Sequence, residues 1–427
     1  MRHFIALIAT LPALLSLNGC GLIGLPNVAV QGKGTPANPP ILSAFEGAPP
    51  IFSVIDWETK RAPQLREAFQ NNIYGRFPDA QPVSVIARTD LSLDYANLAS
   101  AQQWLVQIGE ARSDLKFSMV LLLPKTTGPA ATKPAPIIVM ENFCGNALAL
   151  KNAAGVASPR FGTPKECQNS LMLPVVPVIF GGAIVHPPID RILAAGYGVA
   201  MLYGGDVVSD DAAKAAKILQ QLTPAGTPPS QRTGAIAAWA WTYLRAVDAL
   251  SSDPRVDAGK LVLWGHSRNG KAALLAAAFD PRPAGVIALQ SGTAGGSLGR
   301  DDVGESIAKI TQAFPHWFAP AYADWSQRQN QMSVDQHQLL ALIAPRPVML
   351  GSARRDQWSD PQGALRAAAG ASPVYQLYSA APFVQNDLRQ PDFRPGLVTY
   401  MRGGLHGIHS EDWDMALLFL ERKFSNH

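Results

Sequence analysis

The chain has 427 residues, of which 47% are hydrophobic and 16% are charged. This apolar content excludes a disordered chain and is enough for one large domain or two small ones. The formal net charge is +4 and Lys and Arg form no dense run, so the chain lacks the clustered positive charge that nucleic-acid binding requires.

The first residues, MRHFIALIATLPALLSLNGC, predict export. A positive start at Arg2 precedes the apolar stretch Phe4–Leu17, which is too short for a comfortable membrane span. The letters LNGC resemble a bacterial lipobox. We therefore expect residues 1–19 to be a lipoprotein signal peptide, with Cys20 lipidated; an ordinary signal peptide with a chance cysteine is the alternative. The lipoprotein would be exported to the outer membrane, on the periplasmic side or at the cell surface, and would touch the membrane only through its lipid.

A change of composition separates this start from the rest of the chain. Residues 20–50 are rich in Pro, Gly and Ala, which predicts a tether. Residues 51–427 are expected to form one domain, and we expect a monomer. Its two cysteines, Cys144 and Cys167, can form a disulfide in an oxidising compartment or remain separate buried thiols. The sequence leaves both possibilities open.

Strand-like and helix-like segments alternate along this domain. The strand-like segments are 83–88, 104–110, 117–123, 137–140, 199–203, 261–264, 285–289 and 347–350. The helix-like segments are 60–71, 234–249, 270–279 and 413–424. Short apolar runs between helices predict a mostly parallel sheet with helices on both faces, a three-layer α/β sandwich. The first two strands are expected to form an antiparallel edge.

The segment LVLWGHSRNGK, residues 261–271, places a serine in a tight turn between a strand and a helix. This is the arrangement of the nucleophile elbow of α/β-hydrolases, in which small neighbours leave room for a strained turn. Gly265 and Gly270 supply that room around Ser267, although Asn269 stands where the strict G-x-S-x-G pattern has glycine. The alternative is a glycine-rich turn in which the serine only caps the helix.

A serine nucleophile needs a base, and the chain has eight histidines. Two of them, His406 and His409, lie in the loop GGLHGIHSEDW before the terminal helix, which is where α/β-hydrolases carry their histidine. His266 adjoins the serine and is expected to point away from it. The remaining histidines are expected to have other roles: His3, His186, His316, His337 and His427.

The acid that orients the histidine should follow a late strand. The segment PVMLGSARRDQWSDP supplies Asp356 and Asp360 after such a strand. Asp360 precedes a proline and a helix, so capping of that helix is its alternative role.

These motifs resemble the glucuronoyl esterases, carbohydrate esterase family 15. The letters GHSRNGK resemble the family's nucleophile motif G-C-S-R-x-G-K. Further similar segments follow in the same order over nearly all of residues 50–424: NIYGRFP, ENFCGN, YGGDV, VGESIAKITQAFPHWF, DQHQLLALIAPRP, DQWSDP and HGIHSEDW. The family hydrolyses the ester between 4-O-methylglucuronic acid on xylan and alcohols of lignin.

The resemblance implies a role for individual residues. Ser267 would be the nucleophile, His406 rather than His409 the base, and Arg268 would help to hold the oxyanion through its guanidinium. Substrate-binding residues carried over by position are Lys271, Glu305, Trp358 and Phe143. The chemistry implied is acyl transfer through serine, which needs no metal or organic cofactor.

One position departs from the family. Many members carry the catalytic acid in a segment like ESG, which here reads QSG with Gln290. Because glutamine carries no charge, we expect Asp356 to be the acid, with Asp360 in reserve. The family's cysteine before the nucleophile is His266 here, so the fungal disulfide is not implied. Two alternative functions remain: an esterase for another sugar ester such as acetylated xylan, and a non-catalytic carbohydrate-binding lipoprotein.

Overall fold

The computed structural model describes residues 38–43, 50–95, 97–110, 114–125, 133–150, 152–163, 167, 181–184, 186–384 and 388–425. The predicted signal peptide and Cys20 lie outside these residues.

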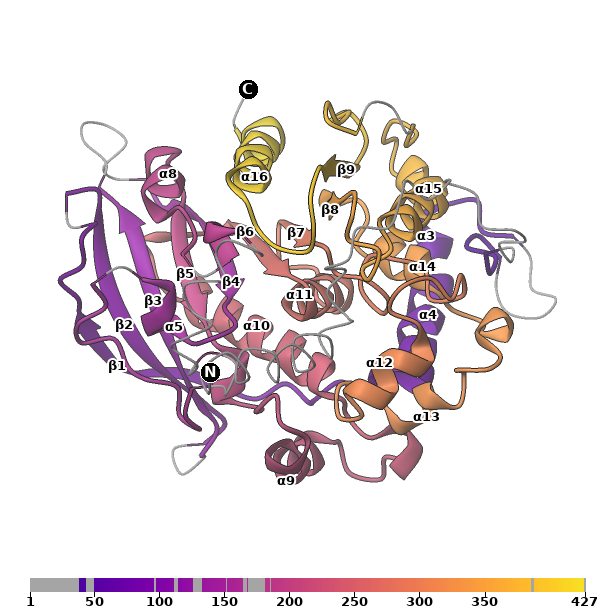
Figure 1. Cartoon of the computed structure of the whole chain (residues 1–427), viewed down its shortest axis with the longest axis horizontal. Coiled ribbons are helices and arrows are strands. Elements are labelled where there is room, and N and C mark those ends of the chain that lie inside the picture. Colours follow the sequence, from indigo (N-terminus) through magenta and orange to yellow (C-terminus); the bar gives the residue numbers. More distant parts are fainter. Residues whose placement is uncertain are drawn as a thin grey trace, which may run out of the picture.

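A nine-stranded sheet forms the centre of the molecule, with strand order β1-β2-β3-β5-β4-β6-β7-β8-β9 (Figure 1). The strands are β1 (Val83–Asp90), β2 (Ala99–Ile108), β3 (Lys116–Pro124), β4 (Ala135–Glu141), β5 (Gly198–Leu202), β6 (Val256–His266), β7 (Gly285–Leu289), β8 (Val348–Ala353) and β9 (Leu397–Arg402). Strands β4 to β9 pair in parallel, whereas β1, β2 and β3 pair antiparallel and β3 joins β5 antiparallel. The mostly parallel sheet and its antiparallel edge confirm the prediction from the sequence.

Helices cover both faces of this sheet. The α-helices are α3 (Val54–Asp56), α4 (Ala62–Phe69), α5 (Asn146–Ala149), α8 (Ile189–Ala194), α9 (Ala212–Leu222), α10 (Ala235–Ser251), α11 (Arg268–Phe279), α12 (Ile307–Ala313), α13 (Pro320–Ala323), α14 (Gln336–Ala341), α15 (Pro361–Leu377) and α16 (Ser410–Phe424). Shorter helical turns are η1 (Trp57–Arg61), η2 (Gln70–Tyr74), η4 (Gly182–Ile184), η5 (Gly204–Asp206), η6 (Pro229–Gln231) and η7 (Gln329–Gln331). Helices α4, α10, α11, α14 and α15 pack into one hydrophobic cluster, and α8 and α16 pack into the other.

The burial of the strands explains why the sequence showed them clearly. Every residue of β5, β7 and β8 is buried, because helices cover both faces at these positions. A strand buried on both faces has to be apolar at every position rather than at alternate ones. Helix α11 is rich in alanine, and small side chains allow it to lie close to the sheet beneath the carboxyl end of β6.

Part of the predicted tether is bound to the domain. Arg61 donates hydrogen bonds to the carbonyl oxygens of Pro40 and Ile41, and Gln338 on α14 donates to the same Pro40 oxygen. Buried side chains of η1 and α14 therefore hold the backbone at Pro40 and Ile41.

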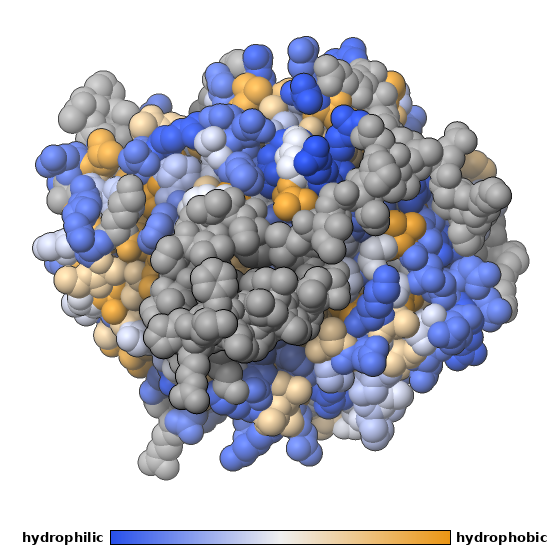
Figure 2. All heavy atoms as spheres, in the orientation of Figure 1, coloured by the Kyte–Doolittle hydropathy of each residue, from blue (hydrophilic) through white to orange (hydrophobic). Residues whose placement is uncertain are grey.

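Cys144 and Cys167 form a disulfide, which decides between the two possibilities that the sequence left open. Within the described ranges, no helix is both long and apolar enough to cross a bilayer. On the face drawn in Figure 2, hydrophobic residues are scattered among hydrophilic ones and do not gather into one patch.

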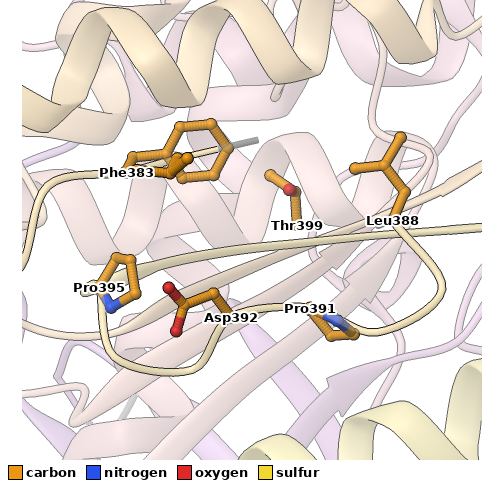
Figure 3. Close-up of a pocket in the computed structure, with 7 residues that line it drawn as sticks. Phe383, Leu388, Pro391, Asp392, Pro395 and Thr399 are labelled. Atoms are coloured by element: carbon orange, nitrogen blue, oxygen red, sulfur yellow. The ribbon is translucent and has the colours of Figure 1, made fainter. Parts of the chain in front are cut away.

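A small pocket lies in the segment that leads into β9 (Figure 3). Phe383, Pro391, Asp392 and Thr399 are among its lining residues, and Asp392 pairs with Arg394. None of the predicted site residues lines it, so this pocket is not part of the candidate site.

Candidate active site

Ser267 occupies a strained turn at the carboxyl end of β6. Its backbone has φ 55° and ψ −126°, and it is the N-cap of α11. A non-glycine residue with positive φ costs free energy that the surrounding structure must compensate. A Cβ at position 265 would lie 2.3 Å from the Asn269 carbonyl oxygen, so only glycine fits there. This is the geometry of a nucleophile elbow.

The structure also explains the departure from the strict G-x-S-x-G pattern. The Asn269 side chain is buried and donates a 3.0 Å hydrogen bond to the Glu141 carbonyl oxygen at the end of β4. Its polar group is therefore satisfied. The need for a small residue lies instead at the next position, because a Cβ at Gly270 would lie only 3.0 Å from the Ser291 Cβ.

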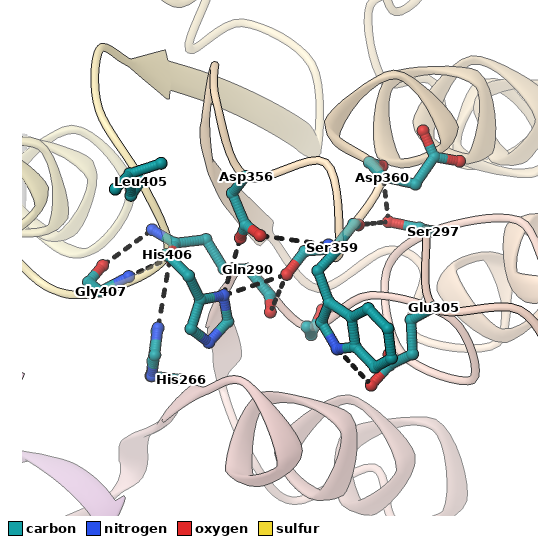
Figure 4. Close-up of polar contacts among 12 residues, drawn as sticks. His266, Gln290, Ser297, Glu305, Asp356, Ser359, Asp360, Leu405, His406 and Gly407 are labelled. Atoms are coloured by element: carbon teal, nitrogen blue, oxygen red, sulfur yellow. Dashed lines mark hydrogen bonds and ion pairs between the residues drawn. The ribbon is translucent and has the colours of Figure 1, made fainter. Parts of the chain in front are cut away.

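His406 and Asp356 form a buried pair at the same edge of the sheet (Figure 4). His406 Nδ1 lies 2.7 Å from Asp356 Oδ2, and the Asp356 side chain is 1% exposed. Burial alone would raise the pKa of Asp356, but the His406 ring and hydrogen bonds from Ser359 outweigh burial and hold this pKa below its ordinary value. Asp356 is thus an anion that accepts the Nδ1 proton of His406, which leaves His406 Nε2 unprotonated and able to act as a base.

The reserve candidates have structural roles. Asp360 caps α15 by accepting from the Gly363 N–H at 2.9 Å, and burial raises the pKa of Asp360 to about 6. His409 is the N-cap of α16, and its backbone N–H donates to Asp412 Oδ2. Neither residue is bonded to the His406–Asp356 pair in the contacts of the described chain. His316 and His337 are hydrogen-bonded to Asp210 and to the Pro39 carbonyl oxygen, as expected for structural histidines.

The His266 ring ties the histidine loop to the elbow. The centroids of the His266 and His406 rings lie 4.6 Å apart, and His266 directly precedes Ser267 in the chain. The His406 ring therefore lies beside the residue that precedes Ser267. Burial first, and then the nearby His406 ring, lower the pKa of His266 well below its ordinary value, so His266 is neutral. The sequence expectation that His266 points away from the serine did not anticipate this contact with His406.

Arg268 is held in place at the start of α11. Its Nη1 lies 2.7 Å from Asp210 Oδ2, and its guanidinium lies 5.0 Å from the centroid of the Phe143 ring. The carboxylate of Asp210 also accepts from Trp317 Nε1 at 2.6 Å. Burial alone would raise the pKa of Asp210, but Arg268 and the bonds from His316 and Trp317 lower it. Asp210 is therefore ionised and fixes the direction of the guanidinium.

Lys271, Glu305 and Trp358 form one network on the other side of the elbow. Lys271 Nζ donates to Glu305 Oε2 at 2.5 Å and to the carbonyl oxygens of Ser291 and Thr293. Trp358 Nε1 donates to Glu305 Oε1 at 3.1 Å. Burial raises the pKa of Glu305 even though Lys271 lies against its carboxylate. Three protein oxygens accept from the Lys271 ammonium group, one for each of its protons.

The sequence reasoning missed Asp210 and Ser359. Ser359 donates its backbone N–H to Asp356 Oδ1 at 3.2 Å, and its Oγ lies 3.2 Å from His406 Nδ1. A hydroxyl three residues after a candidate carboxylate is a common local capping pattern and could have drawn attention to Ser359. Asp210 follows the YGGDV segment closely in the chain and stands beside a second aspartate in VVSDDAA. These letters do not distinguish either aspartate from an ordinary solvent-exposed carboxylate, so the sequence carries no signal for Asp210.

Comparison with known proteins agrees with this geometry. The family described as "Glucuronyl esterase, fungi" matches residues 228–379. A carbohydrate esterase named MZ0003, from an unknown prokaryotic organism, is 29% identical over 385 residues, which cover 87% of this chain and 86% of that protein.

Solved structures are similar over almost the whole chain. A promiscuous CE15 esterase from a marine bacterial metagenome aligns with a TM-score of 0.78 at 29% identity, covering 91% of this chain and 97% of that one. A glucuronoyl esterase from Solibacter usitatus aligns with a TM-score of 0.76 at 32% identity, covering 91% and 98%. With its elbow and its His406–Asp356 pair, the chain belongs to the glucuronoyl esterases of carbohydrate esterase family 15 and is a carboxylic ester hydrolase with the α/β-hydrolase fold.

Proposed function

We propose that this enzyme hydrolyses the ester between 4-O-methylglucuronic acid carried by xylan and alcohols of lignin, with Ser267 as its nucleophile. The observation that carries the proposal is the pairing of His406 with the buried carboxylate of Asp356, beside the ring of His266, which precedes Ser267 in the chain. Relatives of this chain include 4-O-methyl-glucuronoyl methylesterases, among them one from Wolfiporia cocos that is 24% identical over 342 residues.

The reaction is a two-step acyl transfer. His406 Nε2 takes the hydroxyl proton of Ser267, and the oxygen attacks the uronate carbonyl carbon. The C–O bond to the alcohol breaks, and the alcohol leaves with the proton from His406. Water, deprotonated by the same ring, then attacks the acyl carbon and releases glucuronate and free Ser267. Asp356 stabilises the imidazolium that forms in each step.

Charge that develops on the carbonyl oxygen has donors close by. Ser267 is the N-cap of α11, so the first N–H groups of this helix have no acceptor within it. Arg268 adds a charged donor whose direction Asp210 fixes. A fixed donor needs no reorganisation in the transition state, which is why such groups lower the barrier.

The network of Lys271, Glu305 and Trp358 favours a uronate over an acetyl ester. The carboxylate of Glu305 can accept from sugar hydroxyls, and the Trp358 ring offers a face for the sugar. An acetyl group presents no hydroxyl to this network. We therefore assign Lys271, Glu305 and Trp358 to binding of the uronate ring, with Phe143 beside Arg268.

Turnover of benzyl glucuronate and of an acetyl ester by the full chain tests the proposal. We expect the glucuronate to be the better substrate, and Ser267→Ala to lose at least about 10³-fold in kcat. Glu305→Gln should raise KM for the glucuronate while leaving hydrolysis of the acetyl ester within about threefold. Preference for the acetyl ester would instead favour the esterase of acetylated xylan. The non-catalytic alternative was motivated by the missing carboxylate at Gln290. Asp356, which pairs with His406, supplies a carboxylate from another position, so this reason no longer applies.

We also propose that the enzyme is an exported lipoprotein anchored through Cys20, and a monomer. The lipobox-like letters LNGC support the anchor, and the scatter of hydrophobic residues on the one face drawn in Figure 2 is in keeping with a monomer. Radiolabelled palmitate should enter the wild-type chain in a bacterial host and not a Cys20→Ala variant. Light scattering of the domain should give the mass of one chain. Equal labelling of the wild type and of Cys20→Ala would contradict the lipid anchor, and the mass of two chains would contradict the monomer.

A further inference from the structure

Gln290 stands at the carboxyl end of β7 and contacts the loop that carries His406. Its side-chain Nε2 donates to the Gly407 carbonyl oxygen at 2.9 Å, and its Oε1 accepts from the Gly407 N–H at 2.7 Å. The residue is 3% exposed and has φ 50°. Both backbone groups of the residue after His406 are thus bound by one side chain, which is visible in Figure 4.

These two bonds fix the orientation of the carboxamide. The Gly407 N–H can only donate and its C=O can only accept, so the Gln290 oxygen must face the N–H and the nitrogen must face the C=O. His266 Nε2 lies 3.3 Å from the same Oε1. Since that oxygen only accepts, the neutral His266 ring carries its proton on Nε2.

The backbone of Gln290 is linked to the His406 ring through Ser359. Its carbonyl oxygen accepts from Ser359 Oγ at 3.1 Å, and the same Oγ lies 3.2 Å from His406 Nδ1. Its N–H donates to the Gly351 carbonyl oxygen at 2.7 Å, which anchors it on β8. Gln290 therefore connects β7 and β8 to the backbone that follows His406 and, through Ser359, to His406 Nδ1.

We propose that Gln290 is a positioning residue of the esterase site: its neutral carboxamide holds Gly407, and through it the His406 ring, in the geometry that serves Ser267. The proposal rests on the proposed function of this site. It also means that position 290 of this chain cannot take over the role of the acid.

A carboxylate at this position would oppose the loop. The ionised side chain of a Gln290→Glu variant could still accept from the Gly407 N–H, but its second oxygen would face the Gly407 carbonyl oxygen, which is an acceptor as well. The charged and titratable groups around it are His266, His406, Asp356 and Arg402, whose Nη2 donates to the Gly407 oxygen at 2.6 Å. Alternatively, the guanidinium of Arg402 would attract the carboxylate away from Gly407. In both cases the loop would lose at least one of the two hydrogen bonds that Gln290 makes to Gly407.

A protonated carboxyl group would restore the hold. Its O–H can donate to the Gly407 oxygen while its C=O accepts from the N–H, as the carboxamide does. Burial raises the pKa of a carboxyl group and brings this protonation toward the neutral range. The activity of Gln290→Glu, divided by that of the wild type at each pH, should therefore rise as pH falls.

The decisive experiment compares Gln290→Met, Gln290→Glu and the double variant Gln290→Glu/Asp356→Ala in the full chain. Loss of two buried hydrogen bonds should lower kcat of Gln290→Met on benzyl glucuronate by about tenfold or more. KM should stay within about twofold, because Gln290 is not in the Lys271 network. Labelling of Ser267 by an organophosphate should slow as much as kcat, since both reactions need His406.

Gln336→Met is the matched control. Gln336 is a buried glutamine on α14 whose Oε1 accepts from Tyr74, so this variant loses a buried amide without touching the histidine loop. It should keep the wild-type kcat, whatever its melting temperature.

Two results would overturn the proposal: wild-type kcat and labelling rate in Gln290→Met, or recovery of Asp356→Ala activity by the added Gln290→Glu change. A flat activity ratio for Gln290→Glu at a reduced level would also count against it. Failure of the proposed function looks different, because the wild type itself would then not turn over the glucuronate ester, whereas labelling of Ser267 would still report the positioning of His406.

Discussion

Replacing Asp356 with asparagine should disable the base while leaving the fold intact. Ser359 N–H donates to Asp356 Oδ1 at 3.2 Å, and His406 Nδ1 bonds to Oδ2 at 2.7 Å. In Asp356→Asn the Ser359 N–H selects the amide oxygen for the first position, so the amide NH₂ faces Nδ1. The imidazole must then carry its proton on Nε2, and Nε2 can no longer take a proton from Ser267.

The loss follows from this change of tautomer and from the missing negative charge. The same replacement in a serine protease triad lowers kcat about 10⁴-fold, which corresponds to about 5 kcal/mol of transition-state stabilisation. We expect a loss of about 10³- to 10⁴-fold in kcat on benzyl glucuronate, with KM changed little. Asp360→Asn is the matched control, since asparagine also caps a helix, and it should stay within about threefold of wild type. Retention of a tenth or more of the activity in Asp356→Asn would refute the assignment, as would an equal loss in Asp360→Asn.

Three further predictions concern the residues around this pair. Gly265→Ala places a Cβ 2.3 Å from the Asn269 carbonyl oxygen, so the elbow must open; the free energy of unfolding should fall by about 1–3 kcal/mol or more in thermal melts, and organophosphate labelling of the serine should be lost. Lys271→Met leaves Glu305 buried without its partner, which should cost about 3–5 kcal/mol of unfolding free energy in denaturant titrations, and a wild-type midpoint would contradict it. Burial raises the pKa of Asp360 from 3.8 to about 6, so this group destabilises the fold progressively as pH rises through that interval. Asp360→Asn should therefore gain stability relative to wild type above this interval and not below it, which melting curves at mildly acid and neutral pH can measure.

Much of the sheet could be predicted from the sequence, because strands that are buried on both faces leave apolar runs in it. Strands β7 and β8 are buried on both faces, which leaves an uninterrupted apolar run in the sequence. Strand β9 gave no such signal, because its sequence LVTYMR ends in Arg402, whose guanidinium is buried against Asp412. Only the start of helix α15 was expected, after Asp360 and its proline, since Pro373 and two glycines interrupt the rest of its helical pattern.

The chemistry of the site was predictable and its supporting contacts were not. The order of serine, acid and histidine along the chain follows from the fold, so Ser267, Asp356 and His406 could be proposed from their motifs. Asp356 and Asp360 both follow β8, and only the turn between them decides which carboxylate faces the imidazole. The letter Gln at position 290 showed that a charge is missing, but the partner of its carboxamide lies 117 residues away in the chain.

The pairing of Arg268 with Asp210 bears on how the enzyme releases its product. The ester that enters is neutral at its carbonyl, whereas the uronic acid that leaves is an anion. A guanidinium with no counter-ion would attract that anion and slow its departure. Asp210 already balances the cation at 2.7 Å. If Arg268 holds the tetrahedral oxyanion as proposed, we therefore expect it to retain the product carboxylate only weakly, and accumulating glucuronate to inhibit turnover little.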